Sequence, residues 1–356
     1  MKKRVVVWGT GNVGRPAIRA VISHQNLELV GVVVANPDKV GRDAGDIAGV
    51  DPVGVLATNQ GHELLAQGVD AVVYTATADT RPQQAMADLL ACLSAGVNVV
   101  SSAFYAFLYP PLTPSEMAKQ VEAACKKGNS SLFVSGIDPG WVMDVLPIFL
   151  SAMVSDIEEV RVQEVFNYGL YDQPDVVRHV IGFGLPMDKI PPMLLDFSLR
   201  FVWEPMVRLI ADGLGQAIES VEIEVERLPL QKTIDVPGMG VFEQGTQGAF
   251  RFEVRGICNG RPLIVLEHVT RIDDDCAPDW PYPPEGQGCH RVLIKGTPHL
   301  NVSVHGEDPV EPGPAGGGNA SAACRLVNAI DAVYLAKAGI VSPLDLPLIT
   351  GEPQVR

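Results

Sequence analysis

The chain has 356 residues, which is enough for two domains of ordinary size, each with its own hydrophobic core. Its composition, 47% hydrophobic and 19% charged, is typical of folded globular proteins rather than disordered ones. The net charge of −15 argues against nucleic acid or anionic membranes as partners, because their phosphate groups would be repelled.

Further features of the sequence indicate a cytoplasmic protein. No window approaches the roughly 18 uninterrupted apolar residues that span a bilayer, and the apolar run 5–8 ends at Gly9, too early for a signal peptide. The six cysteines lack CxxC spacing, which favours reduced thiols over disulfides. Cys276, Cys289 and His290 lie in or beside a Pro/Gly-rich loop without ligand spacing, so we predict no metal site.

Up to residue 136 the sequence alternates strand and helix patterns, which is typical of a parallel α/β sheet. Between residues 86 and 93, apolar side chains recur at helical spacing. Short apolar runs predict strands that are buried on both faces, at residues 4–8, 27–35, 53–57, 71–75, 97–100 and 132–134.

The first strand leads directly into a GxGxxG turn, made of Gly9, Thr10, Gly11, Asn12, Val13 and Gly14. A helix pattern follows, which is the context in which this motif carries meaning. Gly9 permits a tight turn, Gly11 lets a pyrophosphate approach the backbone, and Gly14 lets helix and strand pack closely. The start of the helix offers amide hydrogens to the phosphates. The pattern predicts a Rossmann domain that binds a nicotinamide dinucleotide.

The end of the second strand indicates which nicotinamide cofactor binds. Domains that prefer NAD carry an Asp or Glu there to hold the ribose hydroxyls, whereas this strand ends in Asn36. Asn36 would not repel a 2′-phosphate, and Lys39 and Arg42 just beyond could neutralise its charge. We therefore predict NADP, with NAD as the alternative.

In a doubly wound sheet the cofactor crosses the carboxyl ends of the strands. Two more segments are therefore predicted to lie beside the cofactor. The first contains Thr75, Ala76 and Thr77, in a run that ends at Asp79, and the second contains Ser101, Ser102 and Ala103. Small side chains at these positions would let the nicotinamide ribose pass close to the backbone.

The pattern changes after residue 155. Residues 157–165, 221–228 and 250–272 alternate apolar and polar side chains, as half-buried antiparallel strands do, and helical periodicity returns at 320–337. We predict an α/β fold with two domains. The first is a Rossmann domain with a doubly wound parallel sheet at residues 1–150, completed by 320–356. The second, at residues 151–319, is an α+β substrate-binding and dimerisation domain with a mainly antiparallel sheet.

Several segments resemble one family: VVVWGTGNVG, GVVVANPDKVGRDAG, NVVSSA, GIDPGWVMDVLP and LVNAI are similar to the dihydrodipicolinate reductase-like oxidoreductases. Within that family they resemble the branch of 2,4-diaminopentanoate dehydrogenase and the native amine dehydrogenases. The resemblance implies a homodimer that reduces a C=N or C=O carbon with NAD(P)H, or catalyses the reverse reaction. It also implies that Asn328, in LVNAI, contacts the cofactor.

The sequence departs from this family in three places. It lacks the His- and Lys-bearing loop, ending in a Ser-Gly-Thr-Ala-like sequence, of the true dihydrodipicolinate reductases. The amine dehydrogenases carry a glutamate shortly after the fifth strand, whereas residues 101–110 here contain no carboxylate and an aromatic occupies that place. Asp331 follows Asn-Ala-Ile where proline is expected.

Without that glutamate, another group has to supply the proton that accompanies hydride transfer. The candidates are Tyr105, just beyond the fifth strand, and Tyr168, which follows a strand of the second domain. The residues predicted to contact the substrate are Phe104, Trp141, Tyr171 and His179. The alternative for each is a packing or surface role.

These observations predict an NAD(P)H-dependent oxidoreductase that interconverts a hydrophobic ketone, aldehyde or imine with its alcohol or amine. Carbonyl or imine reduction and amine oxidation are equally favoured. The alternative from another class is a non-catalytic NADP(H)-binding sensor or scaffold. A dehydrogenase of a polar amino acid comes third, with Arg161 or Arg178 as the arginine that would bind its carboxylate.

Overall fold

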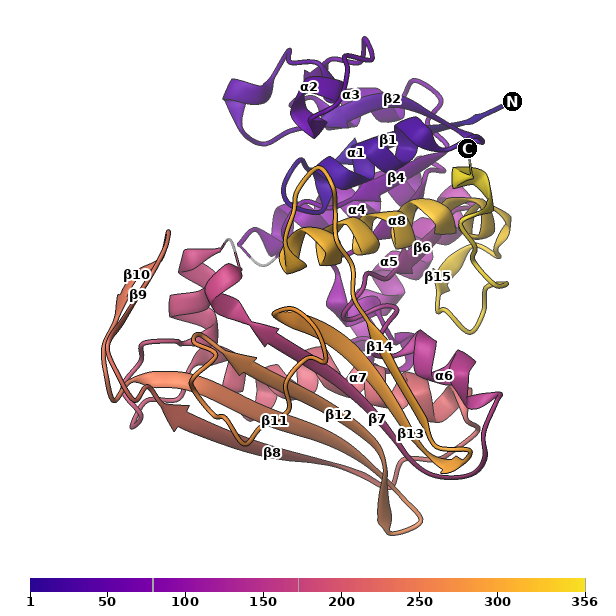
Figure 1. Cartoon of the computed structure of the whole chain (residues 1–356). Coiled ribbons are helices and arrows are strands. Elements are labelled where there is room, and N and C mark those ends of the chain that lie inside the picture. Colours follow the sequence, from indigo (N-terminus) through magenta and orange to yellow (C-terminus); the bar gives the residue numbers. More distant parts are fainter. Residues whose placement is uncertain (79, 172, 356) are drawn as a thin grey trace. The chain divides into compact units, whose positions relative to one another are not determined.

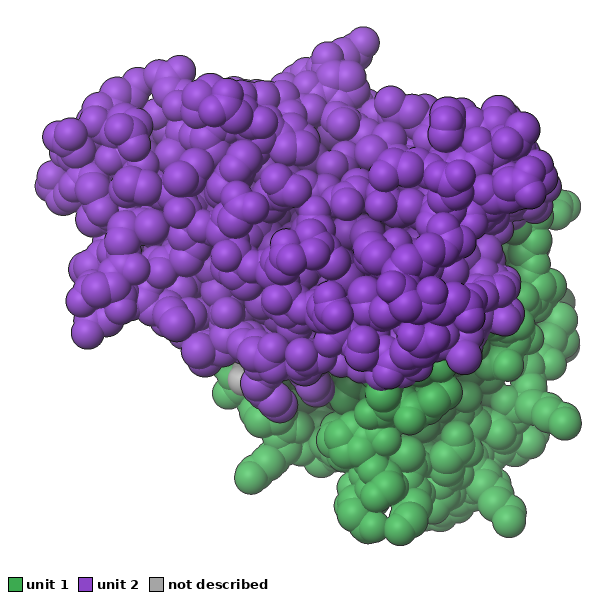
Figure 2. Space-filling view, turned by 90° about the horizontal axis from the view of Figure 1, so that it is seen from below, with its two compact units in different colours: residues 1–140, 319–356 green, residues 141–318 purple. Residues whose placement is uncertain are grey.

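The computed structural model describes residues 1–78, 80–171 and 173–355, and it divides into two compact units (Figures 1 and 2). Unit 1 comprises residues 1–140 and 319–356, and unit 2 comprises residues 141–318. The boundary lies at residue 140, earlier than the predicted 150, because helix α6 (Val145–Ser151) packs against elements of unit 2. Among the described residues, no helix is both long and apolar enough to cross a membrane.

Unit 1 contains a seven-stranded parallel sheet, in the order β15-β6-β5-β4-β1-β2-β3. This order confirms the predicted doubly wound Rossmann sheet. The last strand to join it, β15, comes from the C-terminal segment and pairs with β6. The strands are β1 (Lys3–Trp8), β2 (Leu27–Val33), β3 (Ala57–Thr58), β4 (Ala71–Tyr74), β5 (Asn98–Ser101), β6 (Ser131–Val134) and β15 (Gly339–Val341).

Among the predicted strands of unit 1, the third differs most from the structure. A strand was expected over residues 53–57, but β3 holds only Ala57 and Thr58. The carboxylate of Asp43 accepts hydrogen bonds from the amides of Val53 and Gly54, at 2.9 and 2.7 Å, and so turns this segment into a loop.

The helices of unit 1 connect these strands and cover the sheet (Figure 1). They are α1 (Gly14–Ser23), α2 (Ala44–Ala48), α3 (Gly61–Leu65), α4 (Pro82–Ser94), α5 (Ser115–Gly128) and most of α8 (Pro314–Leu335). Helix α8 places Leu326, Ile330 and Val333 in the same buried cluster as Val5 and Val7 of β1. The C-terminal helix is therefore part of the core of unit 1.

Unit 2 is built on a six-stranded mixed sheet, in the order β14-β13-β7-β12-β11-β8, in which only the β7–β12 pairing is parallel. This confirms the predicted mainly antiparallel second sheet. Its strands are β7 (Ser155–Asn167), β8 (Ser220–Pro229), β11 (Gln247–Cys258), β12 (Arg261–Arg271), β13 (Gly288–Thr297) and β14 (Leu300–Val304). A separate hairpin is formed by β9 (Ile234–Val236) and β10 (Gly240–Phe242).

The two faces of this sheet carry different chemistry, because successive side chains of a strand point to opposite faces. Helix α7 (Asp196–Gly213) packs on one face, where Trp203 meets Phe252 of β11. The opposite face carries a ladder of buried ion pairs, in which Arg161 lies 2.7 Å from Glu253 and 2.6 Å from Glu267. We call this second face the ion-pair face.

Asp331, which stands where the resemblance predicts proline, forms an ion pair. Its carboxylate lies 2.5 Å from Nζ of Lys3 and accepts a hydrogen bond from Nδ2 of Asn26 at 3.1 Å. Burial would raise the pKa of Asp331, but the hydrogen bonds from Lys3 and Asn26 and the charge of Lys3 outweigh it and hold that pKa below its usual value. Asp331 thus joins α8 to the first strand.

We expect Asp331→Asn to lower the free energy of unfolding by about 0.5–1 kcal/mol at pH 7, as for other partly exposed ion pairs. An acid whose pKa is lower in the folded state stabilises the fold at pH values above its unfolded-state pKa. This stabilisation is lost as the pH falls through its folded-state pKa. The difference between the wild type and the variant should therefore shrink below about pH 4. Urea unfolding at pH 7 and pH 3 measures it. A difference that stays constant between these pH values would contradict the ion pair.

Candidate active site

The glycine-rich turn of unit 1 is held by close backbone contacts. A Cβ atom on Gly9 would lie 2.5 Å from the amide nitrogen of Ala76, and one on Gly14 would lie 2.2 Å from the carbonyl oxygen of Gly9. A Cβ on Gly11, by contrast, would meet nothing within 4 Å. The protein's own packing thus requires Gly9 and Gly14 but leaves space at Gly11, which fits the close approach of a pyrophosphate.

Helix α1 begins directly after this turn. Its N-cap, Val13, makes no side-chain capping bond, and no acidic residue lies in the first turn. The positive end of the helix dipole therefore points toward the space beside Gly11 without a carboxylate of its own to neutralise it. These features fit the phosphates of a dinucleotide.

The small residues predicted beside the cofactor are used to join strand ends. Thr75 Oγ1 donates to the carbonyl oxygen of Gly9 at 3.2 Å, and Ser101 Oγ donates to that of Tyr74 at 2.8 Å. Ser101 Oγ also accepts from the amide of Ala103 at 3.0 Å. These hydroxyls fix the backbone around the turn. Ala76 and Ser102 are half-buried, Thr77 is exposed, and Asp79 lies outside the described residues.

The cations after β2 gather at the glycine-rich turn. Lys39 Nζ donates to the carbonyl oxygen and to Oγ1 of Thr10, at 3.1 and 3.2 Å. Burial and the neighbouring charges of Arg15 and Arg42 lower the pKa of Lys39. Asn36 Oδ1 accepts from the amide of Asp38 at 2.9 Å, which fixes the turn that carries Lys39. Like charges held together in this way favour binding of an anion.

Phe104, Tyr105 and Asn328, also predicted as site residues, belong to other segments of unit 1. The ring of Phe104 is buried and packs 5.1 Å from that of Tyr74. Tyr105 is half-buried in a short 3-10 helix, Tyr105–Phe107. Asn328 Oδ1 accepts from Nε2 of Gln354 at 3.3 Å, so it contacts the C-terminal segment.

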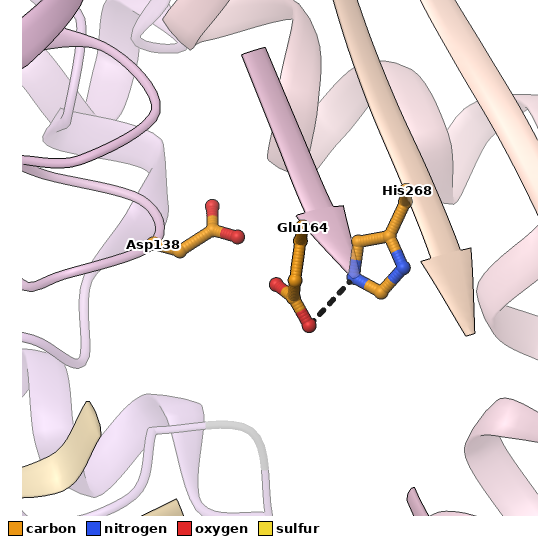
Figure 3. Close-up of side chains that lie close together, drawn as sticks. All are labelled: Asp138, Glu164 and His268. Carbon is orange, nitrogen blue, oxygen red and sulfur yellow. Dashed lines mark ion pairs between the residues drawn. The ribbon is translucent and has the colours of Figure 1, made fainter. Parts of the chain in front are cut away.

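A buried acidic and histidine cluster lies in unit 2, and its core was missed by our sequence reasoning. Glu164 of β7 pairs in register with His268 of β12 on one side and His290 of β13 on the other. All three residues are buried, on the face that α7 covers. Figure 3 shows the Glu164–His268 pair; Asp138, also drawn there, belongs to the loop after β6 in unit 1.

The carboxylate of Glu164 is held by hydrogen-bond donors. Its Oε1 lies 3.1 Å from Nε2 of His268 and accepts from the hydroxyl of Tyr168 at 2.8 Å. Its Oε2 lies 3.9 Å from Nε2 of His290. On the far side of His268, Nδ1 is 2.6 Å from Oγ1 of Thr270. Thr270, His268, Glu164 and Tyr168 therefore form a continuous chain of groups that can exchange protons.

Aromatic rings surround this chain. The ring of His268 stacks on those of Phe252 and Phe250, with centroids 5.0 and 5.9 Å apart, and Trp203 meets it edge-on at 5.8 Å. Burial lowers the pKa of His290, although the charge of Glu164 opposes this. Burial and the charge of Glu164 raise the pKa of Tyr171, whose ring lies 5.1 Å from that of Tyr168.

Such an arrangement can hold a cation beside a carboxylate and move a proton away from it. The sequence placed Tyr168 and Tyr171 in this region, and the structure brings both to Glu164. Glu164 and His268 were missed because they read as ordinary members of alternating strands. The available signal was that both fall on the apolar face of their strands, where charged residues are rarely buried alone.

Other predicted residues of unit 2 lie elsewhere or are engaged in other contacts. Trp141 is half-buried, and His179 is exposed on the π-helix Val176–Ile181. Arg161 belongs to the ion-pair face, and Arg178 binds the carbonyl oxygens of the β9–β10 hairpin. These engagements count against the use of either arginine for a substrate carboxylate.

Cys276, Cys289 and His290, for which the sequence predicts no metal site, do not lie together, because the sheet separates His290 from the two cysteines. Cys276 and Cys289 lie in an apolar cluster with Trp280, whereas His290 pairs with Glu164. Because Cys289 and His290 are consecutive in β13, their side chains point to opposite faces.

Comparisons with known proteins agree with this architecture. Residues 3–103 match the family model described as dihydrodipicolinate reductase, N-terminus, and residues 141–353 match the 2,4-diaminopentanoate dehydrogenase C-terminal domain. The chain is 48% identical to an amine dehydrogenase of Streptomyces virginiae over 345 residues, 96% of each chain. It is 24% identical to 2,4-diaminopentanoate dehydrogenase of Acetoanaerobium sticklandii, over 98% of this chain and 94% of that one.

A solved structure has the same fold. The amine dehydrogenase of Mycobacterium smegmatis superposes with a TM-score of 0.74 at 20% identity, covering 100% of this chain and 99% of that one.

The contrast between the glycines gives a prediction. We expect Gly14→Ala to lower the thermal midpoint, because its Cβ would meet a backbone oxygen at 2.2 Å and overpacking costs about 1–3 kcal/mol. Gly11→Ala should leave the thermal midpoint of the apoprotein unchanged and weaken NADPH binding roughly tenfold or more. Differential scanning fluorimetry and fluorescence titration measure the two effects. If Gly11→Ala bound NADPH as tightly as the wild type, the cofactor would not approach this turn.

Proposed function

The chain belongs to the family of 2,4-diaminopentanoate dehydrogenase and the amine dehydrogenases, and we propose that its own reaction is NADP(H)-linked amine oxidation and its reverse, with a hydrophobic substrate. Family membership makes the protein an NAD(P)-dependent oxidoreductase of the amine dehydrogenase type. The choice of NADP, the amine chemistry and the substrate class are the proposal.

The observation that carries the amine chemistry is the buried carboxylate of Glu164, with its donors Tyr168 and His268. In the proposed reaction a primary ammonium ion, NADP⁺ and water give a carbonyl compound, NH₄⁺, NADPH and one proton. The carbon loses a hydride, the C–N bond is replaced by C=O, and protons leave and return at nitrogen. This chemistry needs a group that holds a cation and takes up a proton, which a carboxylate does.

Asn36, at the position where NAD-preferring domains carry an acid, supports NADP. Asn36 stands where an acid would repel a 2′-phosphate, and Arg15, Lys39 and Arg42 gather near the turn. When bound, the cofactor accepts or supplies the hydride. Arg and Lys side chains near the end of the second strand are the usual way in which a Rossmann domain accommodates the additional phosphate.

The aromatic surroundings of His268 support a hydrophobic substrate. Phe250, Phe252 and Trp203 pack around the imidazole, and Tyr168 and Tyr171 pack against each other beside it. Apolar and aromatic surfaces with few polar groups bind hydrophobic ligands and orient them by those few groups.

The test of the function is NADPH consumption with a panel of ketones and aldehydes, with and without excess ammonium. Turnover that requires ammonium is expected. Turnover without ammonium would mark a carbonyl reductase and overturn the amine chemistry. Tight NADPH binding with no turnover on any substrate, in either direction, would favour a cofactor-binding sensor or scaffold.

We expect Lys39→Ala and Arg42→Ala each to raise the KM for NADPH roughly tenfold, because each removes a cation near the proposed 2′-phosphate site. The KM for NADH, which lacks that phosphate, should change less than twofold, on the order of the scatter between unrelated surface variants. Lys127→Ala, which removes a cation from the last turn of α5, is the matched control. Equal losses for both cofactors would contradict the assignment.

We also propose that the protein is a homodimer, as its resemblance to the family implies. Exposed apolar side chains of unit 2 support an interface, among them Ile190, Leu195 and the stacked pair Phe197 and Phe201. Light scattering should give twice the 38.1 kDa of the chain, and a monomer at micromolar concentration would contradict it.

A further inference from the structure

We propose that Glu164 is the catalytic carboxylate that binds the substrate's ammonium group and removes its proton, with His268 and Tyr168 as positioning residues. This inference rests on the proposed amine dehydrogenase function and deepens it. The glutamate that the related amine dehydrogenases carry after the fifth strand is absent, and the acid is instead supplied by a strand of unit 2.

The partners of Glu164 distinguish it from the structural glutamates of the same sheet. On the ion-pair face, Glu253 is held by Arg161, Arg251 and Arg255. Guanidinium groups stay charged and cannot take up a proton at neutral pH. Their attraction for Glu253 outweighs its burial and lowers its pKa to about 2. Glu253 therefore stays ionised and serves the fold.

Glu164 is held instead by a phenol and an imidazole, both of which can exchange a proton. Among the described residues of unit 2, the titratable groups with a recorded contact or charge interaction with it include Tyr168, Tyr171, His268 and His290. Aromatic rings pack against His268 beside it, so a cationic substrate group would regain from Glu164 part of the solvation that it loses on burial.

Position also matters, because the carboxylate must be held firmly to act on one atom. Glu164 lies in the middle of three hydrogen-bonded strands, with His268 and His290 directly opposite in the two neighbouring strands. Side chains on paired strands are better fixed than those on loops. Tyr168, four residues further on, closes over the same oxygen from the turn Tyr168–Leu170.

The proposed step balances in atoms and charge. An N–H bond of the substrate ammonium breaks and an O–H bond forms on Glu164, which leaves a neutral amine. The nitrogen lone pair then forms C=N as the hydride departs from carbon. Glu164 keeps this proton until it returns it to the nitrogen of the carbinolamine. Water then adds to the C=N carbon, and the protonated ammonia leaves as the C=O forms.

The experiment compares Glu164→Gln with Glu159→Gln. Both make the same change on β7, but Glu159 lies on the ion-pair face, beside Arg161 and Lys295. For oxidation of a hydrophobic amine such as cyclohexylamine, we expect Glu164→Gln to lose about 10²–10⁴-fold in kcat/KM, the usual effect of losing a general base. Glu159→Gln should stay within about twofold of the wild type, and both variants should bind NADPH normally.

A binding measurement separates this assignment from the proposed function. Calorimetry with the NADPH-loaded protein compares cyclohexylamine with cyclohexanol, which lacks the cation. Glu164→Gln should lose amine binding and keep alcohol binding. If the wild type has no amine turnover but binds the amine through Glu164, the ammonium-binding role of Glu164 stands, and its catalytic role and the proposed function fail. If the wild type is active and Glu164→Gln is equally active, the function stands and the assignment is overturned.

Two conservative variants keep the proposal testable if Glu164→Gln does not fold. Glu164→Asp keeps the charge but moves it back by one methylene, and it should lower kcat more than it changes the dissociation constant of the amine. Tyr168→Phe removes one donor to Oε1 and should also lower kcat while leaving NADPH binding unchanged. If both variants retained wild-type kcat, Glu164 would have a structural role only.

Discussion

A buried carboxylate is the constraint on which the site in unit 2 depends. Removing an ionised group from water costs several kcal/mol unless donors surround it. Glu164 meets this requirement through the register of its sheet, which sets His268 and His290 directly opposite it. A slip of one residue in β12 would turn His268 to the other face and leave Glu164 without that partner. The register of the sheet therefore determines whether Glu164 has the partners that its proposed chemistry needs.

In unit 1 the constraint is steric: the glycine-rich turn has no room for side chains at two of its positions. Gly9 and Gly14 bring the end of β1 to within van der Waals contact of the segment after β4, where no side chain would fit. The space beside Gly11 and the cations near Thr10 then remain for an anion. In our proposal, one unit recognises phosphate by backbone and positive charge, while the other uses a carboxylate among aromatic rings. In the proposed amine oxidation, the first environment would hold the cofactor that takes the hydride and the second would take the proton.

Local patterns made the fold of unit 1 and its nucleotide site predictable. Gly9 to Gly14 and Lys39 lie within one strand–helix–strand segment, so spacing alone placed them together. The segment at 53–57 was mispredicted because the side chain of Asp43 competes for its amides. Glu164 could not be found in the same way. It reads as one more polar residue in an alternating strand, and its burial depends on His268 and His290, which lie far along the chain.

Two departures from the related family show why single positions are weak evidence about function. Asp331 replaces an expected proline, yet it forms an ion pair with Lys3 that joins α8 to β1. The carboxylate missing after β5 argues against amine chemistry only if that chemistry is tied to one place in the sequence. The reaction requires a carboxylate at the substrate nitrogen, whatever strand or loop supplies it. In the proposal, Glu164 meets that requirement because it is buried beside a phenol and an imidazole, which can exchange protons.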